Sequence, residues 1–131
     1  MSASGNAELV RRAYAASDEA DIETLTALID ENASWCTPGR SPVAGVYQGR
    51  DAVLAQLRRY GGDTGGTFRL DLKQVFMSDD GRVVGLHHSS GERNGRCLDT
   101  DCCVVFEVVD GRVVSGREHV FDLAGWDAFW S

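Results

Sequence analysis

Apolar residues in the first half of the chain recur every three or four positions, the period of a helix that buries one face. The first such run contains Leu9, Val10, Ala13 and Tyr14, and the second contains Ile22, Leu25, Leu28 and Ile29. Asp21 precedes the second run, where its carboxylate can accept hydrogen bonds from the unpaired N–H groups of the first turn. A third helix is predicted over residues 51–57 and is expected to break at Gly61-Gly62.

The segment between the second and third helices carries a different pattern. Residues 33–37 predict a short strand, and residues 38–49 contain both prolines of the chain and three glycines. Proline and glycine punctuate regular structure, so residues 38–49 are predicted to form an irregular loop.

From residue 67 onward the apolar period changes to two, which is typical of strands with one buried face. Four strands are predicted, over residues 67–77, 82–93, 96–109 and 112–121. The turns between them carry Asp79-Asp80-Gly81, Asn94-Gly95 and Asp110-Gly111, which favour tight hairpins. The even positions from Leu98 to Val108 are expected to face the core. Three successive hairpins predict an antiparallel meander.

The chain ends in a cluster of aromatic residues. Trp126, Phe129 and Trp130 stand at helical spacing, which predicts a short C-terminal helix or turn that docks them on an apolar surface. Helices followed by a long curled sheet define an α+β fold. At 131 residues, a single domain over residues 1–131 is expected.

Charge narrows the expected partners. The formal net charge is −7, and the basic pairs Arg11-Arg12 and Arg58-Arg59 fall within mixed helical patterns. Nucleic acid is therefore not an expected partner, because its phosphates attract clustered cations. No run of 18 apolar residues predicts a membrane span. The first twelve residues, MSASGNAELVRR, do not have the pattern of a signal peptide, so a cytoplasmic location is expected.

Neither the cysteines nor the histidines have the spacing of a metal site. Cys36, Cys97, Cys102 and Cys103 include no Cys-x-x-Cys pair, so reduced, buried thiols are expected. His87 and His88 are neighbours in a predicted strand, and their side chains therefore point to opposite faces. Because Val84 and Leu86 share its parity, His88 is predicted to be the histidine that faces the interior. No metal and no cofactor is expected.

The order of these elements resembles the nuclear transport factor 2-like superfamily, and especially its SnoaL-like and ketosteroid-isomerase-like bacterial members. The stretches that carry the resemblance are residues 20–35 (ADIETLTALIDENASW), 47–57 (YQGRDAVLAQL), 104–114 (VVFEVVDGRVV) and 116–122 (GREHVFD). The resemblance implies a cone, in which a curled antiparallel sheet wraps around the N-terminal helices and leaves a pocket at its open end. It also implies a homodimer packed through the sheet and a small hydrophobic molecule as the ligand.

The residues that a ketosteroid isomerase uses are missing. Aligned on Asp21, its tyrosine falls at Ala13, its base at Thr37, and its protonated acid at Cys103 or Val104. The SnoaL-like cyclases give a better match at the last strand, where their carboxylate base corresponds to Asp122. The alternative for Asp122 is an N-cap of the C-terminal segment.

Further candidates surround that strand. Glu118 shares strand parity with Asp122 and is expected to assist it, unless it forms an ion pair with an arginine. His119 is a candidate proton donor or acceptor, or else a surface or interface histidine. The predicted pocket walls are Tyr14, Trp35, Tyr47 and His88. Asp99 and Asp101 are expected on a solvated face. The alternatives are a pair with Arg117 or with an arginine of a second subunit, and an epoxide-hydrolase-like arrangement with Arg117.

Two functions of different classes remain open at this point. The first is a cofactor-independent isomerase or cyclase that transfers protons on a hydrophobic carbonyl compound. The second is a non-catalytic module of the same fold that binds a hydrophobic ligand or dimerises. The missing isomerase residues favour the second, and the polar cluster over residues 117–122 favours the first.

Overall fold

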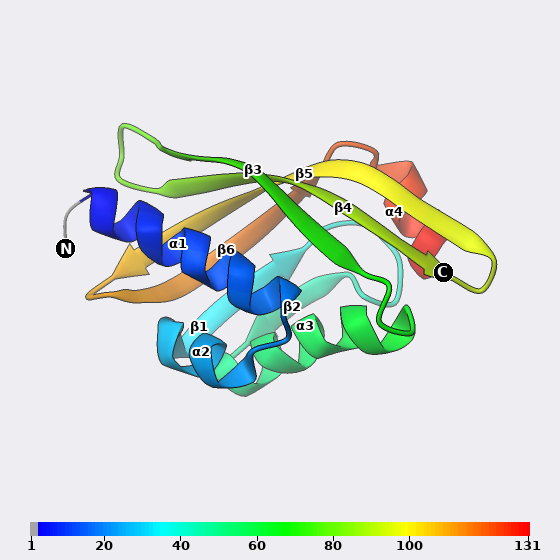
Figure 1. Ribbon diagram of the computed structural model, residues 1–131, viewed down its shortest axis with the longest axis horizontal. Coiled ribbons are helices and arrows are strands. Elements are labelled where there is room, and N and C mark those ends of the chain that lie inside the picture. The colour runs from blue at the N-terminus through cyan, green and yellow to red at the C-terminus, as the bar shows by residue number, and fades with distance from the viewer. Residues whose placement is uncertain (1–2) are drawn as a thin grey trace.

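A curled six-stranded sheet wraps around helices in the computed structural model (Figure 1). The helices are α1 (Ala3–Asp18), α2 (Ile22–Leu28), α3 (Arg50–Asp63) and α4 (Leu123–Trp130). The strands are β1 (Ile29–Thr37), β2 (Gly45–Gln48), β3 (Arg69–Met77), β4 (Val83–Arg93), β5 (Arg96–Val109) and β6 (Arg112–Val120). The structure describes residues 3–131. Residues 1 and 2, which begin the segment predicted not to be a signal peptide, lie outside the described residues.

The sheet order is β2-β1-β6-β5-β4-β3. Strands β3 to β6 pair antiparallel in succession, which confirms the predicted meander. Asn94 and Asp110 adopt positive φ angles of 51° in the turns, as tight hairpins require. Strand β1 extends the sheet by pairing parallel to β6, and β2 adds an antiparallel edge.

Three element boundaries differ from the prediction. Ile29 begins β1 instead of ending the second helix, and residues 45–48 of the predicted loop form β2. Residues 45–48 form a strand because they pair with the edge of β1, where Tyr47 lies opposite Trp35. The third helix continues through Gly61-Gly62 to Asp63. The burial of Tyr60 and a 2.7 Å hydrogen bond from the Thr64 hydroxyl to the Tyr60 carbonyl oxygen offset the low helix propensity of glycine there.

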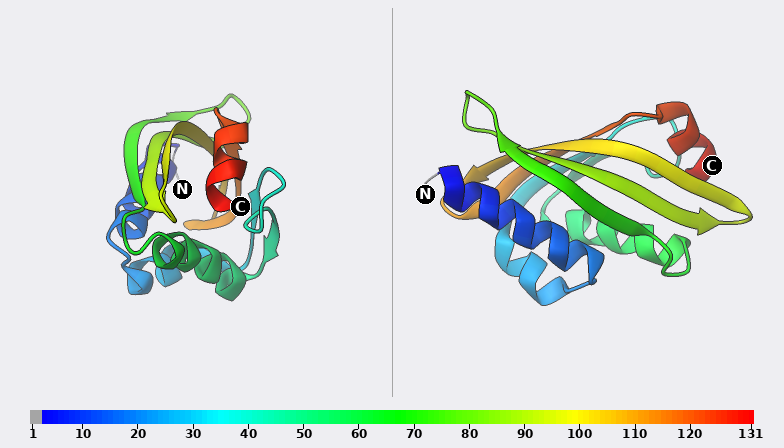
Figure 2. Two further views of the ribbon diagram at one scale, coloured as in Figure 1. Left: turned by 90° about the vertical axis from the view of Figure 1, so that its right-hand side faces the viewer. Right: turned by 45° about the horizontal axis from the view of Figure 1, so that its top comes forward.

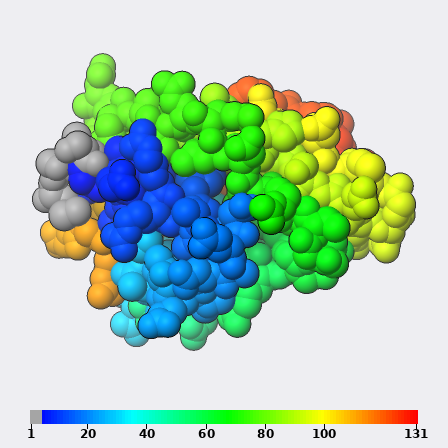
Figure 3. Space-filling model, viewed as in Figure 1, coloured from blue at the N-terminus to red at the C-terminus, as the bar shows by residue number. Residues whose placement is uncertain are grey.

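Two apolar clusters fill the inside of the curl. The larger one joins α1, α2 and α3 to the inner face of the sheet. The smaller one gathers the C-terminal aromatics around Tyr60 and Leu98, which confirms the docking predicted for that segment. In Figure 2 the strands arch over an interior that α3 closes from the opposite side, while α4 lies along one end of the curl. Figure 3 shows α1 and α2 covering much of one face of the molecule.

The burial pattern of β5 agrees with its sequence. Leu98, Thr100, Cys102, Val104 and Phe106 are buried. Their neighbours Asp99 and Asp101 are exposed on the outer face of the sheet. Among the described residues, no helix has both the length and the apolar character that crossing a bilayer requires.

Candidate functional site

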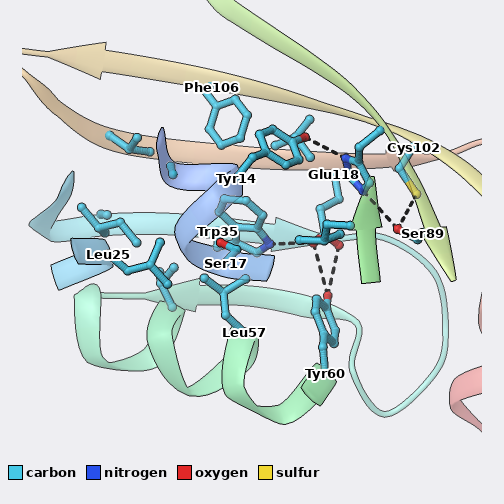
Figure 4. A pocket seen from close by; sticks show the side chains of 18 of the residues that line it. Tyr14, Ser17, Leu25, Trp35, Leu57, Tyr60, Ser89, Cys102, Phe106 and Glu118 are labelled. Carbon is cyan, nitrogen blue, oxygen red and sulfur yellow. Dashed lines mark hydrogen bonds between the residues drawn. The ribbon is translucent and has the colours of Figure 1, made fainter. Parts of the chain in front are cut away.

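A cavity lies between the inner face of the sheet and helices α1 and α3 (Figure 4). It contains about 730 Å³ of space free of protein atoms, its open end included. Most of its wall is apolar. The described residues that line it include one carboxylate, Glu118, and one histidine, His87, but no lysine or arginine. The cavity therefore provides hydrogen-bonding groups in an apolar surrounding without a fixed positive charge.

Glu118 reaches this cavity from near the end of β6 and is only 8% exposed. The indole N–H of Trp35 donates to its Oε1 atom at 3.0 Å, and the Tyr60 hydroxyl donates to its Oε2 atom at 3.1 Å. Burial raises the pKa of Glu118 from 4.5 to about 7, even though these hydrogen bonds oppose the shift. The carboxyl group therefore exchanges its proton near neutral pH.

The hydroxyl of Tyr60 is oriented by a buried amide. Gln56 Nε2 lies 2.9 Å from the Val43 carbonyl oxygen, 3.1 Å from Tyr60 Oη and 3.2 Å from Thr37 Oγ1. The amide has two hydrogens, which these three acceptors share, and the Tyr60 hydroxyl donates its own proton to Glu118. Burial and the Glu118 charge both raise the pKa of Tyr60, which keeps it a neutral donor.

A second group of polar side chains comes from β4 and β5, which lie beside β6 in the sheet, and from Tyr14 of α1. Tyr14 Oη is 2.7 Å from His87 Nδ1, and His87 Nε2 is 3.1 Å from Ser89 Oγ. Ser89 Oγ in turn lies 3.6 Å from the sulfur of Cys102. Burial lowers the pKa of His87 to about 4, so its imidazole is neutral at physiological pH.

Two glycines allow aromatic rings to lie against the sheet. A Cβ atom at Gly85 would stand 2.5 Å from a ring carbon of Tyr14, and one at Gly116 would stand 2.2 Å from a ring carbon of Trp35. Any side chain at these positions would displace the ring beside it. Gly85 and Gly116 therefore determine where the hydroxyl of Tyr14 and the indole of Trp35 point.

The structure brings three of the predicted site residues together and leaves the others outside the cavity. Tyr14, Trp35 and Glu118 line it. The ion pair considered for Glu118 does not form with any described arginine. Tyr47 lies on β2 at the sheet edge, where its hydroxyl donates to the Val43 carbonyl oxygen at 2.6 Å, and it does not line the cavity.

Asp122 and His119 do not line the cavity either. Asp122 is exposed and caps α4 by accepting a 3.0 Å hydrogen bond from the Gly125 amide, as its alternative interpretation predicts. The predicted convergence of Asp122 with Glu118 is wrong, because β6 ends at Val120 and the parity of the strand does not continue to Asp122. His119 follows Glu118 directly and is exposed on the outer face.

The prediction that His88 faces the interior is also wrong. Val83, Gly85, His87 and Ser89 face inward, while Val84 and Leu86 lie half-buried on the outer face. His88 shares that outer face, where its ring contacts Asp99 and, at 2.7 Å, Asp101. These hydrogen bonds raise its pKa. Asp99 and Asp101 thus pair with a histidine, and the structure does not place them with Arg117 in the cavity.

Among the polar residues that line the cavity, Tyr60, His87 and Ser89 were not predicted to do so from the sequence. Tyr60 follows Gln56 by four positions and Val53 by seven, which is the spacing of one buried helix face. The helix predicted over residues 51–57 ended before Tyr60, whereas the observed helix includes Tyr60 on its buried face. For His87, the alternation of apolar residues in the sequence indicated the outer face. It failed because the apolar residues of β4 occupy both faces of the strand.

The metal-ligating residue types are dispersed. Within residues 3–131, no three His, Cys, Asp or Glu side chains form a group that could hold a metal ion. The four cysteines are free thiols, but only Cys102 is buried. Cys97 is exposed beside the β4–β5 turn, and Cys36 and Cys103 are half-buried. The prediction of uniformly buried thiols is therefore wrong, since these positions do not all face the core.

Comparison with known proteins assigns the family. A model of the SnoaL-like domain matches residues 10–116, and the chain belongs to this family. An uncharacterized protein of Mycobacterium tuberculosis is 30% identical over 131 residues, which is the whole of both chains.

Solved structures show the same fold. Bal32a, from a soil-derived mobile gene cassette, is 58% identical with a TM-score of 0.96, and the alignment covers 98% of each chain. An NTF2-like protein from Burkholderia xenovorans is 24% identical with a TM-score of 0.82, covering 100% of this chain and 99% of the other. The SnoaL-like family that the sequence resembles is thereby confirmed, and so is its cone-shaped α+β fold.

Proposed function

We propose that the cavity is the active site of a cofactor-independent isomerase or cyclase that moves protons on a small hydrophobic carbonyl compound. Glu118 is the proposed base that removes a proton from the carbon next to the carbonyl group. The observation that carries this proposal is the placement of a single buried carboxyl group, held by two neutral donors, in the wall of an apolar cavity.

The chemistry follows from the surroundings of Glu118. A general base works best when its pKa lies near the operating pH, and burial brings the pKa of Glu118 to about 7. Trp35 and Tyr60 hold the carboxylate in position while it acts. With no lysine or arginine in the described wall, the site suits a neutral substrate. Asp122, the base predicted from the sequence, is replaced by Glu118 in this proposal.

Hydrogen–deuterium exchange tests the proposed base directly. A panel of small aromatic and alicyclic ketones is incubated with the protein in D2O, and loss of the proton next to the carbonyl is followed by NMR. We expect the wild type to accelerate exchange of at least one ketone, with a rate that rises through about pH 7 as Glu118 loses its proton. Glu118→Gln should lower that rate by at least about 100-fold, the lower end of general-base contributions.

Asp122→Asn is the matched control for this experiment. It removes a carboxylate from the same stretch of chain, but Asp122 is exposed and caps α4, so the exchange rate should stay near that of the wild type. Equal exchange by wild type and Glu118→Gln would contradict the proposed base. Binding of ketones without any exchange would instead support the alternative, a module that binds a hydrophobic ligand without catalysis.

We further propose that a second copy of this chain packs against the outer face of β4, β5 and β6. The register places Leu86 beside Cys103 and His119, and Val84 beside Val105 and Arg117. Val84, Leu86, Cys103 and Val105 thus form an apolar strip. The strip runs between the acidic pair Asp99–Asp101 and Arg117, which makes no ion pair with any described residue. Two copies related by a twofold axis can join these opposite charges across the apolar strip.

Light scattering coupled to size-exclusion chromatography tests this dimer. The wild type should elute with about twice the mass of the 14.2 kDa chain. Arg117→Glu places a like charge against the acidic pair and should shift the protein toward the monomer. Arg58→Glu makes the same change on α3, at another exposed position, and should leave the mass unchanged. A monomeric wild type would contradict the proposed dimer.

A further inference from the structure

The second group of polar side chains in the cavity forms a continuous chain of hydrogen bonds, in which the donors and acceptors can be arranged in two directions. The chain runs from Tyr14 to His87, Ser89 and the sulfur of Cys102 (Figure 4). The hydroxyl groups of Tyr14 and Ser89 can each donate or accept, and a neutral imidazole donates from one nitrogen and accepts at the other. The direction of one hydrogen bond in the chain therefore sets the direction of the next.

In the first arrangement the Tyr14 hydroxyl donates to His87 Nδ1, over 2.7 Å. His87 then carries its proton on Nε2 and donates to Ser89, which donates to the sulfur of Cys102. Each group along the chain has a partner in this arrangement. The oxygen of Tyr14 keeps a lone pair that can accept a hydrogen bond from a ligand hydroxyl.

In the second arrangement every bond of the chain is reversed. Cys102 donates to Ser89, Ser89 donates to Nε2, and Nδ1 carries the proton and donates to Tyr14. The Tyr14 proton is then released toward another acceptor. Among the described residues its only other partner is the Gly85 carbonyl oxygen, 3.5 Å away, which is at the limit of a hydrogen bond. A carbonyl oxygen in the cavity would provide the missing acceptor.

We propose that this chain is the binding site for the ligand's oxygen, and that the His87 tautomer changes with the hydrogen-bonding character of that oxygen. A ketone oxygen only accepts, and it selects the second arrangement, with the proton on Nδ1. A hydroxyl group that donates selects the first, with the proton on Nε2. The inference rests on the proposed function in one respect, because a carbonyl ligand that loses a proton from carbon becomes an enolate or enol.

The value of this arrangement is that it serves both forms of one ligand. When the proton that Glu118 takes from carbon is delivered to the ligand's oxygen, an oxygen that only accepts becomes a hydroxyl that donates, and a fixed donor at that place would fit only the carbonyl form. Here the same heavy atoms fit both forms. The enol proton comes from the ligand's carbon by way of Glu118, and the chain itself neither gains nor loses a proton, because its four side chains are neutral in both arrangements. His87 is in this sense a positioning residue: it acts through Tyr14, which touches the ligand.

Nitrogen NMR of histidine-labelled protein tests the inference, because protonated and unprotonated ring nitrogens resonate far apart. The spectra are recorded for the free protein, with acetophenone, and with 3-ethylphenol, two probes of similar size that present a pure acceptor and a strong donor. His88 and His119 lie outside the cavity and provide controls in the same spectra.

We expect Nε2–H for His87 in the free protein, a change toward Nδ1–H with acetophenone, and Nε2–H with 3-ethylphenol. Tyr14→Phe should abolish the difference between the probes. It should also weaken acetophenone binding by up to about tenfold, which corresponds to one neutral hydrogen bond. Nδ1–H in the free protein, the same tautomer with both probes, or no effect of either probe on His87 would overturn the inference.

The same spectra of Glu118→Gln separate this inference from the proposed function. If the tautomer changes with acetophenone while neither protein exchanges ketone protons, the oxygen site stands and the proposed catalysis fails. If the wild type exchanges ketone protons while the His87 tautomer stays constant, catalysis by Glu118 stands and the oxygen site fails.

Discussion

Replacing Trp130 with alanine is expected to lower the free energy of unfolding by about 3–5 kcal/mol, the usual range for removing a large buried aromatic side chain. Trp130 is 1% exposed and lies at the centre of the smaller apolar cluster. Its ring packs against Tyr60, with centroids 5.1 Å apart, and against Phe129 at 4.8 Å. Urea unfolding at fixed protein concentration measures the change.

Two further substitutions make this prediction specific. Trp130→Phe retains an aromatic ring and removes an indole N–H that is buried without a partner among the described residues, so its cost should be clearly smaller. Val46→Ala truncates a side chain that is 70% exposed, and it should change the stability by less than about 0.5 kcal/mol. A loss below about 1 kcal/mol for Trp130→Ala would show that α4 is not part of the cooperative core.

The proximity of Trp130 to Tyr60 links this stability to the site. Tyr60 belongs to the aromatic cluster and also donates to Glu118. Loosening α4 should therefore weaken the hydrogen bond that holds the carboxylate, although Trp130 itself does not line the cavity. The guanidinium groups of Arg93 and Arg96 donate to the carbonyl oxygens of Phe129 and Ala128, at 3.1 and 2.8 Å, and thereby hold the end of α4.

The second large effect is a dependence of stability on pH that comes from Glu118. Its pKa is 4.5 in an unperturbed chain and about 7 in the folded protein. The folded state therefore binds this proton more tightly than the unfolded state does. The stability that the protonated group provides is fully present below about pH 4.5, declines as the pH rises, and is lost above about pH 7. The shift corresponds to roughly 3 kcal/mol.

Comparison with Glu118→Gln isolates this contribution, because the glutamine resembles the protonated acid and does not titrate. The difference in unfolding free energy, wild type minus variant, should fall by roughly 3 kcal/mol between pH 4.5 and pH 8. All other titrating groups are common to both proteins and cancel in the difference. Parallel stability curves for the two proteins would contradict a raised pKa for Glu118.

Local chemistry in the sequence determined most of the secondary structure. The Asn94-Gly95 and Asp110-Gly111 turns demand positive φ angles, which few other residue pairs adopt, and the hairpins form where these pairs stand. Asp21 caps α2 as predicted, through a 3.1 Å hydrogen bond from the Thr24 amide. Such signals depend on residues that lie within two to four positions of one another, so they can be recognised in the sequence without knowledge of the fold. The alternation along β5 likewise identified its buried face.

Tertiary structure decided which polar groups meet in the cavity. The alternation along β4 does not distinguish His87 from His88. In the fold, the close approach of the Tyr14 ring at Gly85 and the hydrogen bond between Tyr14 and His87 show that His87 is the one inside. Glu118 gains its raised pKa from burial, to which the rings of Trp35 and Tyr60 contribute from 83 and 58 positions away in the chain, while the hydrogen bonds that they donate oppose the shift. Asp122 lies beyond the end of β6, so it does not continue the alternation of that strand and does not line the cavity. Burial and long-range contacts set the chemistry of the site, and neither is a local property of the chain.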